Sequence, residues 1–330
     1  MAKSATFQSK NNVAVKIITE ATMGTTPTDT AFTTMPVTDF SFSDIKKHTL
    51  SVAPSRVGVG GMAQSDDMVK WQKHDVMWEV SMTFHATAQA INRICLALYG
   101  DGDGANALVG SAPAVTSYKH GASNAVPVTL LFENAAHDGE AVDMYFTSCL
   151  CTGLTLTGDI GSNGGVVMGT ATFVTGYKPT EAALSLSGTE TTLTSQTTVF
   201  NMHDLQTTTL DGEDLLLYGF DVAIARPVNR IAHDPDNDFR PMGYSVGAYE
   251  VTGNLTCKRD GEVDDAIDNE AGMVLDLDTT VYRINGDKVF VDEAGISMDD
   301  DGWKQTIPLR FTYNSASTSS NVILINTVAD

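Results

Sequence analysis

The order of elements along this chain repeats once, and the repeat is the strongest constraint on its fold. Leu50-Ser51-Val52-Ala53 matches Phe220-Asp221-Val222-Ala223, and Trp78-Glu79-Val80-Ser81 matches Tyr249-Glu250-Val251-Thr252. Ala53 and Trp78 lie 25 residues apart, and Ala223 and Tyr249 lie 26 apart. A shared order of strand, long loop, strand, helix and closing hairpin indicates two related modules. Chance similarity between two antiparallel β segments is the alternative, because few positions are identical.

Short alternating segments separated by Gly, Asp and Asn turns are typical of a mainly antiparallel β protein. In the clearest strand, residues 76–84, the even-numbered side chains are apolar and residues 79, 81 and 83 are polar. This alternation predicts a half-buried strand, and residues 249–257 match it in the second half. Further strands are predicted over residues 126–132, 141–149, 153–157, 166–177, 280–284, 288–291, 295–298 and 306–313, with a hairpin turn at 158–165.

One amphipathic helix is predicted within residues 86–99, because Ile91, Ile94, Cys95 and Leu98 recur at helical spacing and Gly100 follows. The second half has a weaker helical segment, which carries Val263, Ala266, Ile267, Ala271 and Val274. A stretch rich in Thr, Ser and Gly over residues 180–195 suits a linker. We therefore predict two β-sandwich or barrel domains with one helix each, arranged as an N-terminal arm (1–38), a first domain (39–185), a second domain (186–314) and a C-terminal tail (315–330).

The charge balance excludes a protein that grips nucleic acid through its phosphates. The chain has 20 Lys and Arg against 41 Asp and Glu, a formal net charge of -21. The excess is uneven: residues 1–185 carry 16 acids and 11 bases, and residues 186–330 carry 25 acids and 9 bases. A solvated outer face on the second half would explain the difference. No apolar run approaches the roughly 20 residues of a membrane span, and we see no signal peptide.

No signature of an enzyme, metal site or cofactor site stands out. Cys149 and Cys151 alternate, so both thiols point to one face of a strand, and we expect all four cysteines to be reduced. Residues 233–239 resemble half of a calcium loop but lack its glycine and its closing glutamate. Residues 58–61 are rich in glycine, but no helical pattern follows them. Acid pairs are common in so acidic a chain, so counting them does not exclude a glycosidase dyad.

The opening segment Thr19-Glu20-Ala21-Thr22-Met23-Gly24-Thr25-Thr26-Pro27 carries an E-x-x-x-G-T-x-P pattern. It is similar to the start of many tail tube (major tail) proteins of long, non-contractile-tailed bacteriophages of the siphovirus type. The long loop between Val52 and Trp78, the strand after it, the single helix and the terminal hairpin follow the order of that fold. The resemblance covers nearly the whole chain.

This resemblance implies a structural virion protein, made in the host cytoplasm, that polymerises into stacked rings. The rings form the phage tail tube, a negatively charged conduit for DNA ejection into the host. Members that fuse two tube folds build a ring from three chains, so the repeat implies homotrimeric rings; a hexamer follows instead if the second domain is outer decoration. The implied partners are the chain itself, the tape measure protein, the tail terminator and passing viral DNA, with no membrane.

Acidic or neutral polar walls would let DNA slide, because lysine-lined walls would trap its phosphates. The polar strand faces supply the candidate lumen-facing residues: Glu79, Ser81, Thr83, Glu250, Thr252, Asn254 and Thr256. Solvent or another subunit is the alternative neighbour of these side chains. Exposed sheet edges would pair between subunits to close an inner barrel.

Flexible arms are predicted at Met1–Thr38, in the loops Ser55–Asp75 and Arg226–Arg240, and at Ser315–Asp330. We expect removal of the first arm to leave both sheets folded. Mixed charges in the two loops give the candidate ring–ring contacts: Arg56, Asp66, Asp67, Lys70, Lys73, Arg226, Arg230, Asp234, Asp236, Asp238 and Arg240. Ordinary mobile surface loops are the alternative. Two other functions stay open: a tail completion or decoration protein of the capsid or tail, and a surface adhesive β module.

Overall fold

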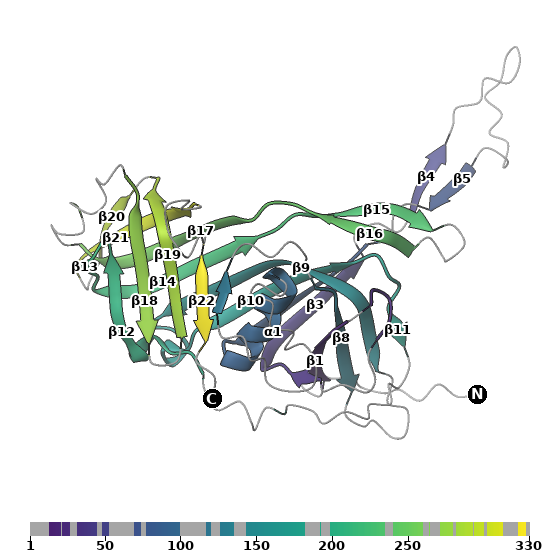
Figure 1. Ribbon diagram of the computed structural model, residues 1–330, viewed down its shortest axis with the longest axis horizontal. Coiled ribbons are helices and arrows are strands. Elements are labelled where there is room, and N and C mark those ends of the chain that lie inside the picture. Colours follow the sequence, from purple (N-terminus) through teal and green to yellow (C-terminus); the bar gives the residue numbers. More distant parts are fainter. Residues whose placement is uncertain are drawn as a thin grey trace, which may run out of the picture.

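Antiparallel strands dominate the structure, a computed structural model, and they join into one network with two additional separate hairpins. Figure 1 shows the longest strands running along the long axis of the molecule, with helix α1 (Ala88–Tyr99) beside them. The structure describes residues 13–20, 22–26, 32–44, 48–52, 69–73, 77–99, 117–119, 126–134, 143–181, 192, 199–234, 240–259, 264, 271–279, 282–292, 294–299, 302–312 and 323–327. The mainly β fold that the alternation predicted is confirmed.

The first half contains two packed layers of strands. One layer follows the pairing order β3, β6, β10, β9, and the other follows β1, β8, β9, with the two-residue strands β2 (Thr33–Thr34) and β11 (Thr180–Glu181) at β1 and β9. The bounds of the main strands are β1 Val13–Thr19, β3 Val37–Asp44, β6 Trp78–His85, β8 Val128–Asn134, β9 Met144–Asp159 and β10 Met168–Thr175. Alternate residues of β6 are buried between the layers, as the sequence pattern predicted.

Strand β9 belongs to both layers because it bends at a bulge. Its register against β8 shifts by one residue near Ser148, whose φ is +49°. The residues of β9 up to Cys149 pair with β8, and those from Leu150 onward pair with β10. The sequence predicted two strands here; one strand of 16 residues is present.

The second half repeats the same ladder order. The layer β14, β17, β21, β20 corresponds to β3, β6, β10 and the second part of β9. The layer β12, β18, β19 corresponds to β1, β8 and the first part of β9. The bounds are β12 Leu205–Leu210, β13 Glu213–Asp214, β14 Leu217–Ala225, β17 Glu250–Lys258, β18 Met273–Thr279, β19 Tyr282–Val291, β20 Gly295–Asp299 and β21 Gly302–Phe311.

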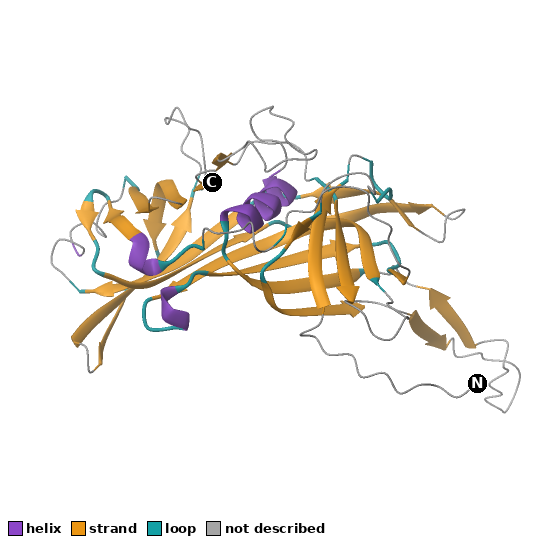
Figure 2. Cartoon of the chain, turned by 90° about the horizontal axis from the view of Figure 1, so that it is seen from below, coloured by secondary structure: helices purple, strands orange, loops and turns teal. Residues whose placement is uncertain are grey.

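The ladder between β9 and β14 joins the long strands of the two halves into one sheet. Strand β9 pairs with β14 in seven consecutive antiparallel pairs, from Gly153↔Ala225 to Asp159↔Gly219. The sheet therefore continues without a break in the order β3, β6, β10, β9, β14, β17, β21, β20. Figure 2 shows these strands crossing the molecule from end to end.

Helix α1 (Ala88–Tyr99) is buried almost completely. Its predicted apolar residues Ile91, Ile94, Cys95 and Leu98 are all in the core. The expected exposed polar face was wrong, because Asn92 and Arg93 are buried too, and the Arg93 Nε donates to the Thr33 hydroxyl at 2.9 Å. Strands β1, β2 and β9 and residues 117–119 and 324–327 lie beside the helix, so it is covered on more sides than its periodicity predicted.

Each predicted loop includes one strand of a β-hairpin, whose other strand lies mainly or wholly beyond the predicted loop. Strands β4 (His48–Val52) and β5 (Val69–Lys73) form one, and β15 (Val228–Asp234) and β16 (Arg240–Val246) form the other. In Figure 1 the β4–β5 hairpin stands away from the molecule, whereas β15–β16 extends back over the first half. Of the two segments matched in the sequence, Leu50–Val52 lies in β4, which pairs with β5, whereas Phe220–Ala223 lies in β14, which pairs with β17 and β9.

Both predicted terminal arms contain a strand that pairs with other strands of the sheet network. Within the range 1–38, strand β1 pairs with all seven residues of β8 and buries Ile17 and Ile18. Removing this range would therefore open the first sheet, contrary to our expectation. Within the range 315–330, strand β22 (Leu324–Thr327) pairs with β19 and with β7 (Ser117–Lys119), and buries Ile325.

The second predicted helix is shortened by a strand. Val274 lies in β18 with its side chain exposed, and Ala271 is in a turn. Asp264 is helical, while its neighbours in this segment, including residues 263, 266 and 267, lie outside the described residues. The same holds for most of the predicted linker 180–195.

Candidate functional site

One face of the eight-stranded sheet is polar across both halves, and it contains every candidate lumen-facing residue. Strand register places matching side chains in rows that cross the sheet. One row consists of Asp39, Thr83, Thr170, Thr155, Ala223, Thr252 and Arg310. We call the side of the sheet that carries this row the polar face; the opposite side carries the buried residues of the same strands.

The candidate residues of the first half lie among small hydroxyl side chains. Ser81 is opposite Thr172 on one side and Ser41 on the other. The Thr83 and Thr170 hydroxyl oxygens are 3.4 Å apart. Glu79 lies opposite Val174 and is half-buried. This half of the polar face is thus mainly uncharged and hydrated.

The candidate residues of the second half are more exposed and include charged neighbours. Glu250, Thr252 and Asn254 are exposed, and Thr256 is half-buried. The Asn254 side-chain amide donates to both carboxylate oxygens of Asp221, at 2.8 and 2.9 Å. Acidic groups on this half are accompanied by a few bases, so the face is not purely anionic.

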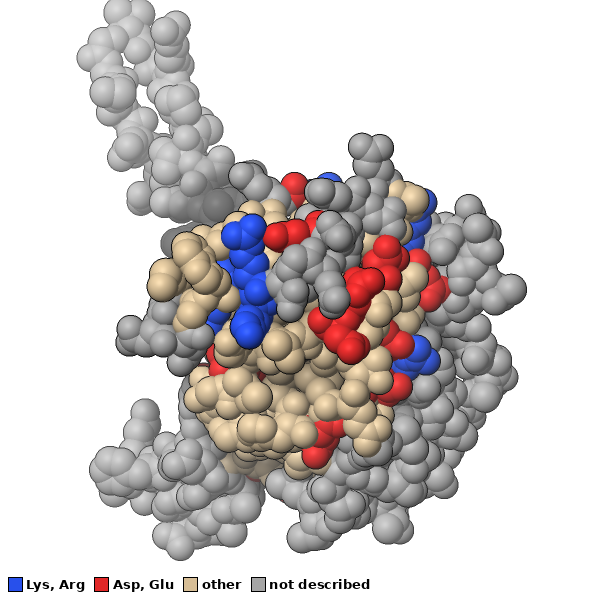
Figure 3. All heavy atoms as spheres, turned by 90° about the vertical axis from the view of Figure 1, so that its left-hand side faces the viewer, with Lys and Arg blue, Asp and Glu red and all other residues tan. Residues whose placement is uncertain are grey.

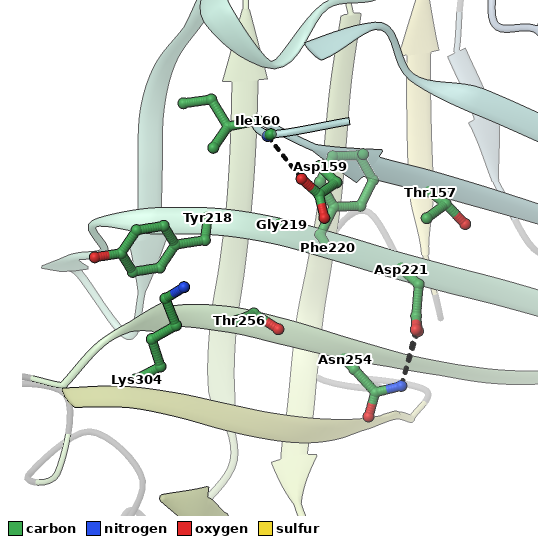
Figure 4. A pocket seen from close by; sticks show the side chains of 12 residues that line it. Thr157, Asp159, Ile160, Tyr218, Gly219, Phe220, Asp221, Asn254, Thr256 and Lys304 are labelled. Atoms are coloured by element: carbon green, nitrogen blue, oxygen red, sulfur yellow. Dashed lines mark hydrogen bonds between the residues drawn. The ribbon is translucent and has the colours of Figure 1, made fainter. Parts of the chain in front are cut away.

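A shallow hollow of about 350 Å³ lies on the polar face beside the β9–β14 ladder. Figure 4 shows Asp221 and Asn254 at one end of it and Tyr218 with Lys304 at the other. The Lys304 ammonium lies 4.5 Å from the centre of the Tyr218 ring, a cation–π contact. The Asp159 carboxylate accepts from the Gly161 amide at 2.7 Å. Neighbours in the chain thus hold the charged groups Lys304, Asp159 and Asp221 that line the hollow.

The candidate ring–ring residues separate into three groups. Lys70 and Lys73 lie in β5, Arg230 and Asp234 in β15, and Arg240 in β16, so all five belong to the two hairpins. Arg56, Asp66, Asp67, Asp236 and Asp238 lie outside the described residues. Arg226 forms the third group, because its side chain is in the interior.

Arg226 is a structural residue and not a surface contact, which corrects its place in the candidate set. One guanidinium nitrogen donates to the Leu98 carbonyl at 2.7 Å and to the Tyr249 hydroxyl at 2.6 Å. Leu98 is in the last turn of α1, where carbonyls lack helical partners and a cation is favourable. Burial raises the pKa of Tyr249 to about 12, although the nearby Arg226 lowers it.

The β15–β16 hairpin is attached to the first half by a specific contact. The Gly176 amide donates to the Tyr244 hydroxyl at 2.9 Å, and the pKa of Tyr244 is raised to about 12, mainly by burial. A Cβ atom at Gly176 would lie 2.9 Å from Pro241. The Pro241 ring therefore leaves little room for any side chain at position 176.

The E-x-x-x-G-T-x-P segment has a structural role that sequence reasoning missed. The Glu20 carboxylate is buried and accepts from the Ser148 amide, the Ser148 hydroxyl and the Thr129 hydroxyl, and also from the Gly24 amide at 3.2 Å. Gly24 adopts φ +81°, which favours glycine. The segment thus fixes the bulge of β9; the four-residue spacing of Glu20 and Gly24 was the available signal.

The far end of the second half is held by ion pairs. Figure 3 shows acidic side chains over the centre of this end and basic ones mainly at one side. Arg283 pairs with Asp276 at 2.5 Å, and hydrogen bonding to this carboxylate raises the pKa of Arg283. Hydrogen bonds from Gln305 and then Arg259 lower the pKa of Asp264.

All four cysteines are buried, and none of them forms a disulfide. Among the described residues, no three His, Cys, Asp or Glu side chains are placed to hold a metal ion. The described helices include none with the length and apolar character of a membrane span. No protein-family profile matches the chain, and no curated protein is significantly similar to it.

Proposed function

We propose that this protein is a tail tube protein of a long-tailed bacteriophage, built from two tandem tube modules. The observation that supports it best is the continuous sheet of eight strands, polar on one face and buried on the other. The repeated ladder order supports a duplication, since each pairing of the first module has a counterpart in the second. The polar face would line the tube, and the two apolar cores would form its wall.

Three chains would supply about 24 strands to one closed barrel. At a strand spacing of about 4.8 Å the barrel would be at least about 37 Å across between backbones, and strand tilt would widen it. Such a bore leaves room for the side chains and for a hydrated DNA duplex. Hydroxyl, amide and acidic side chains would make up most of this wall, and bases such as Lys304 and Arg310 are few, so phosphates would bind weakly and the duplex could move through.

Electron microscopy of the purified protein tests this proposal. We expect tubes of uniform bore, with three-fold symmetry in averaged end-on views. Six-fold symmetry with two distinct radii would mean that the second module decorates the outside. Monomers that bind only to capsids or tail ends would support a decoration or completion protein instead.

The wall charge offers a separate test of the lumen assignment. Glu79→Lys with Glu250→Lys places two cations per chain on the polar face, so we expect DNA ejection to slow while tails still assemble. Glu181→Lys with Glu213→Lys is the matched control, because both residues are exposed and lie outside the polar face. Equal ejection rates in the two double variants would argue against Glu79 and Glu250 in the bore.

A further inference from the structure

The eight-stranded sheet ends in two edges that no described strand covers. Strand β3 pairs with β6 on one side only, and β20 pairs with β21 on one side only. Large apolar side chains are exposed at both edges: Phe42 is 41% exposed, Ile296 49% and Met298 67%. Uncovered apolar edges of this kind favour pairing with another chain.

The covered counterpart of the β3 edge lies within the same chain. Phe42 pairs with Val80 in β6, and Ile224 pairs with Val251 in β17, and these valines hold the same place in the two matching strands. Ile224 is only 2% exposed, because β9 lies against it. Phe42 therefore occupies a position that is buried wherever the neighbouring strand is present.

The other edge also has a covered counterpart, the second part of β9. Thr155 of β9 lies opposite Thr170 of β10. The residue of β21 that matches Thr170 is Pro308, and its carbonyl accepts a hydrogen bond from the Asp292 amide. Asp292 therefore matches Thr155. Leu154 is buried beneath β14, whereas its counterpart Val291 is half-buried. Val291, Asp292 and strand β20 thus present the edge that β9 presents to β14.

We propose that the β9–β14 ladder is repeated between chains: β20 and the end of β19 of one copy pair antiparallel with β3 of a second copy. Copying the internal register, in which Thr155 faces Ala223 and Leu154 faces Ile224, places Asp292 opposite Ser41 and Val291 opposite Phe42 of the second copy. The contact is head-to-tail, so it can close into a ring and leaves no edge uncovered. The proposal deepens the proposed function by naming the partner and register of its ring contact.

Paired cysteines test the register directly. The double variant Ser41→Cys with Asp292→Cys should give disulfide-linked dimers and trimers on non-reducing gels after mild oxidation of the assembled protein. The internal pair Thr155→Cys with Ala223→Cys is the matched control, because it occupies the same position within one chain and should close without linking chains. The native cysteines are all buried, so they need no replacement.

A register-shifted pair, Ser43→Cys with Asp292→Cys, should link less than a tenth as much. Closure of the internal pair without any link between chains would overturn the proposal, as would equal linking by the shifted pair. Tubes in the microscope without the predicted link would leave the tail tube function standing and reject this contact. Linked rings that never stack into tubes would keep the contact and reject the function.

A charge at the edge provides a second measurement. We expect Phe42→Glu to lower association at least tenfold in sedimentation experiments, with an unchanged circular dichroism spectrum. Val274→Glu is the control, since Val274 is similarly exposed, at 44%, but lies in β18 away from both edges. Association of the Phe42→Glu protein equal to that of Val274→Glu would contradict the proposal.

Discussion

Replacing Glu20 tests most directly what stabilises the bulge of β9 in the first half of the chain. Replacing Glu20 with alanine removes the acceptor for the Ser148 amide, the Ser148 hydroxyl and the Thr129 hydroxyl, all of which are buried. Each hydrogen bond to a charged group contributes about 1.5–3 kcal/mol, and water entering the gap recovers part of that. Ser148 also holds a positive φ that costs about 1–2 kcal/mol when unsupported. We expect Glu20→Ala to lower the free energy of unfolding by about 3–5 kcal/mol.

Glutamine at this position should be much milder. The Ser148 amide and the Thr129 hydroxyl both donate to one carboxylate oxygen, which the glutamine carbonyl can replace. Its amide nitrogen can then donate to the Ser148 hydroxyl, so the loss should be about 1–2 kcal/mol. Glu213→Ala, in the exposed strand β13, should change stability by less than about 0.5 kcal/mol.

Urea unfolding followed by tryptophan fluorescence and circular dichroism, at protein concentrations too low for assembly, measures these differences. The reasoning fails if Glu20→Ala unfolds within about 1 kcal/mol of the unchanged protein. It also fails if glutamine is as harmful as alanine, because the loss would then come from charge and not from the number of acceptors.

The remaining predictions concern the interior. Arg226→Met should lower the free energy of unfolding by about 1–3 kcal/mol, because the Tyr249 hydroxyl oxygen loses its donor and the Leu98 carbonyl keeps only the bond from the Tyr249 hydroxyl; a urea midpoint equal to that of the unchanged protein would refute it. Gly169→Ala should cost about 1–3 kcal/mol, since its Cβ atom would lie within the Phe84 ring, whereas Gly295→Ala, with no atom within 4 Å, should cost far less; thermal midpoints compare the two. Burial raises the pKa of Cys151 to about 12 and of Cys257 to about 11, so a thiol reagent at pH 8 should label none of the four cysteines until urea is added. Because these folded pKa values exceed the unfolded ones, the thiols' contribution to stability is complete below about pH 8.5 and falls as pH rises towards 11–12, which pH-dependent unfolding would measure.

Local alternation was enough to predict most strands of the shared sheet. The pattern in β6 identified Val80, Met82 and Phe84 as its core residues, and all three are buried. The hairpin between β9 and β10 was predicted from its glycines and is present. Such features depend on neighbours in sequence, which a single chain records directly.

Features that depend on distant pairing could not be predicted in this way. Residues 13–19 carry no strong alternation, yet they form strand β1, because β8 pairs with all seven of them from more than a hundred residues away. The ladder between β9 and β14 has no local signal in either strand. Arg226 was assigned to a surface loop because nothing near it in sequence indicates that Leu98 and Tyr249 surround it.

The last strand has a consequence for how the protein is made. Strand β22 lies between β7 and β19, so residues 117–119 wait for residues 324–326 to complete their ladder. These segments are separated by about 200 residues, which a ribosome adds in about 10–40 s. The ladder between β7 and β22 therefore cannot form until residues 324–326 have been made. Contacts between neighbouring chains on one polysome that need this ladder would be delayed by the same time.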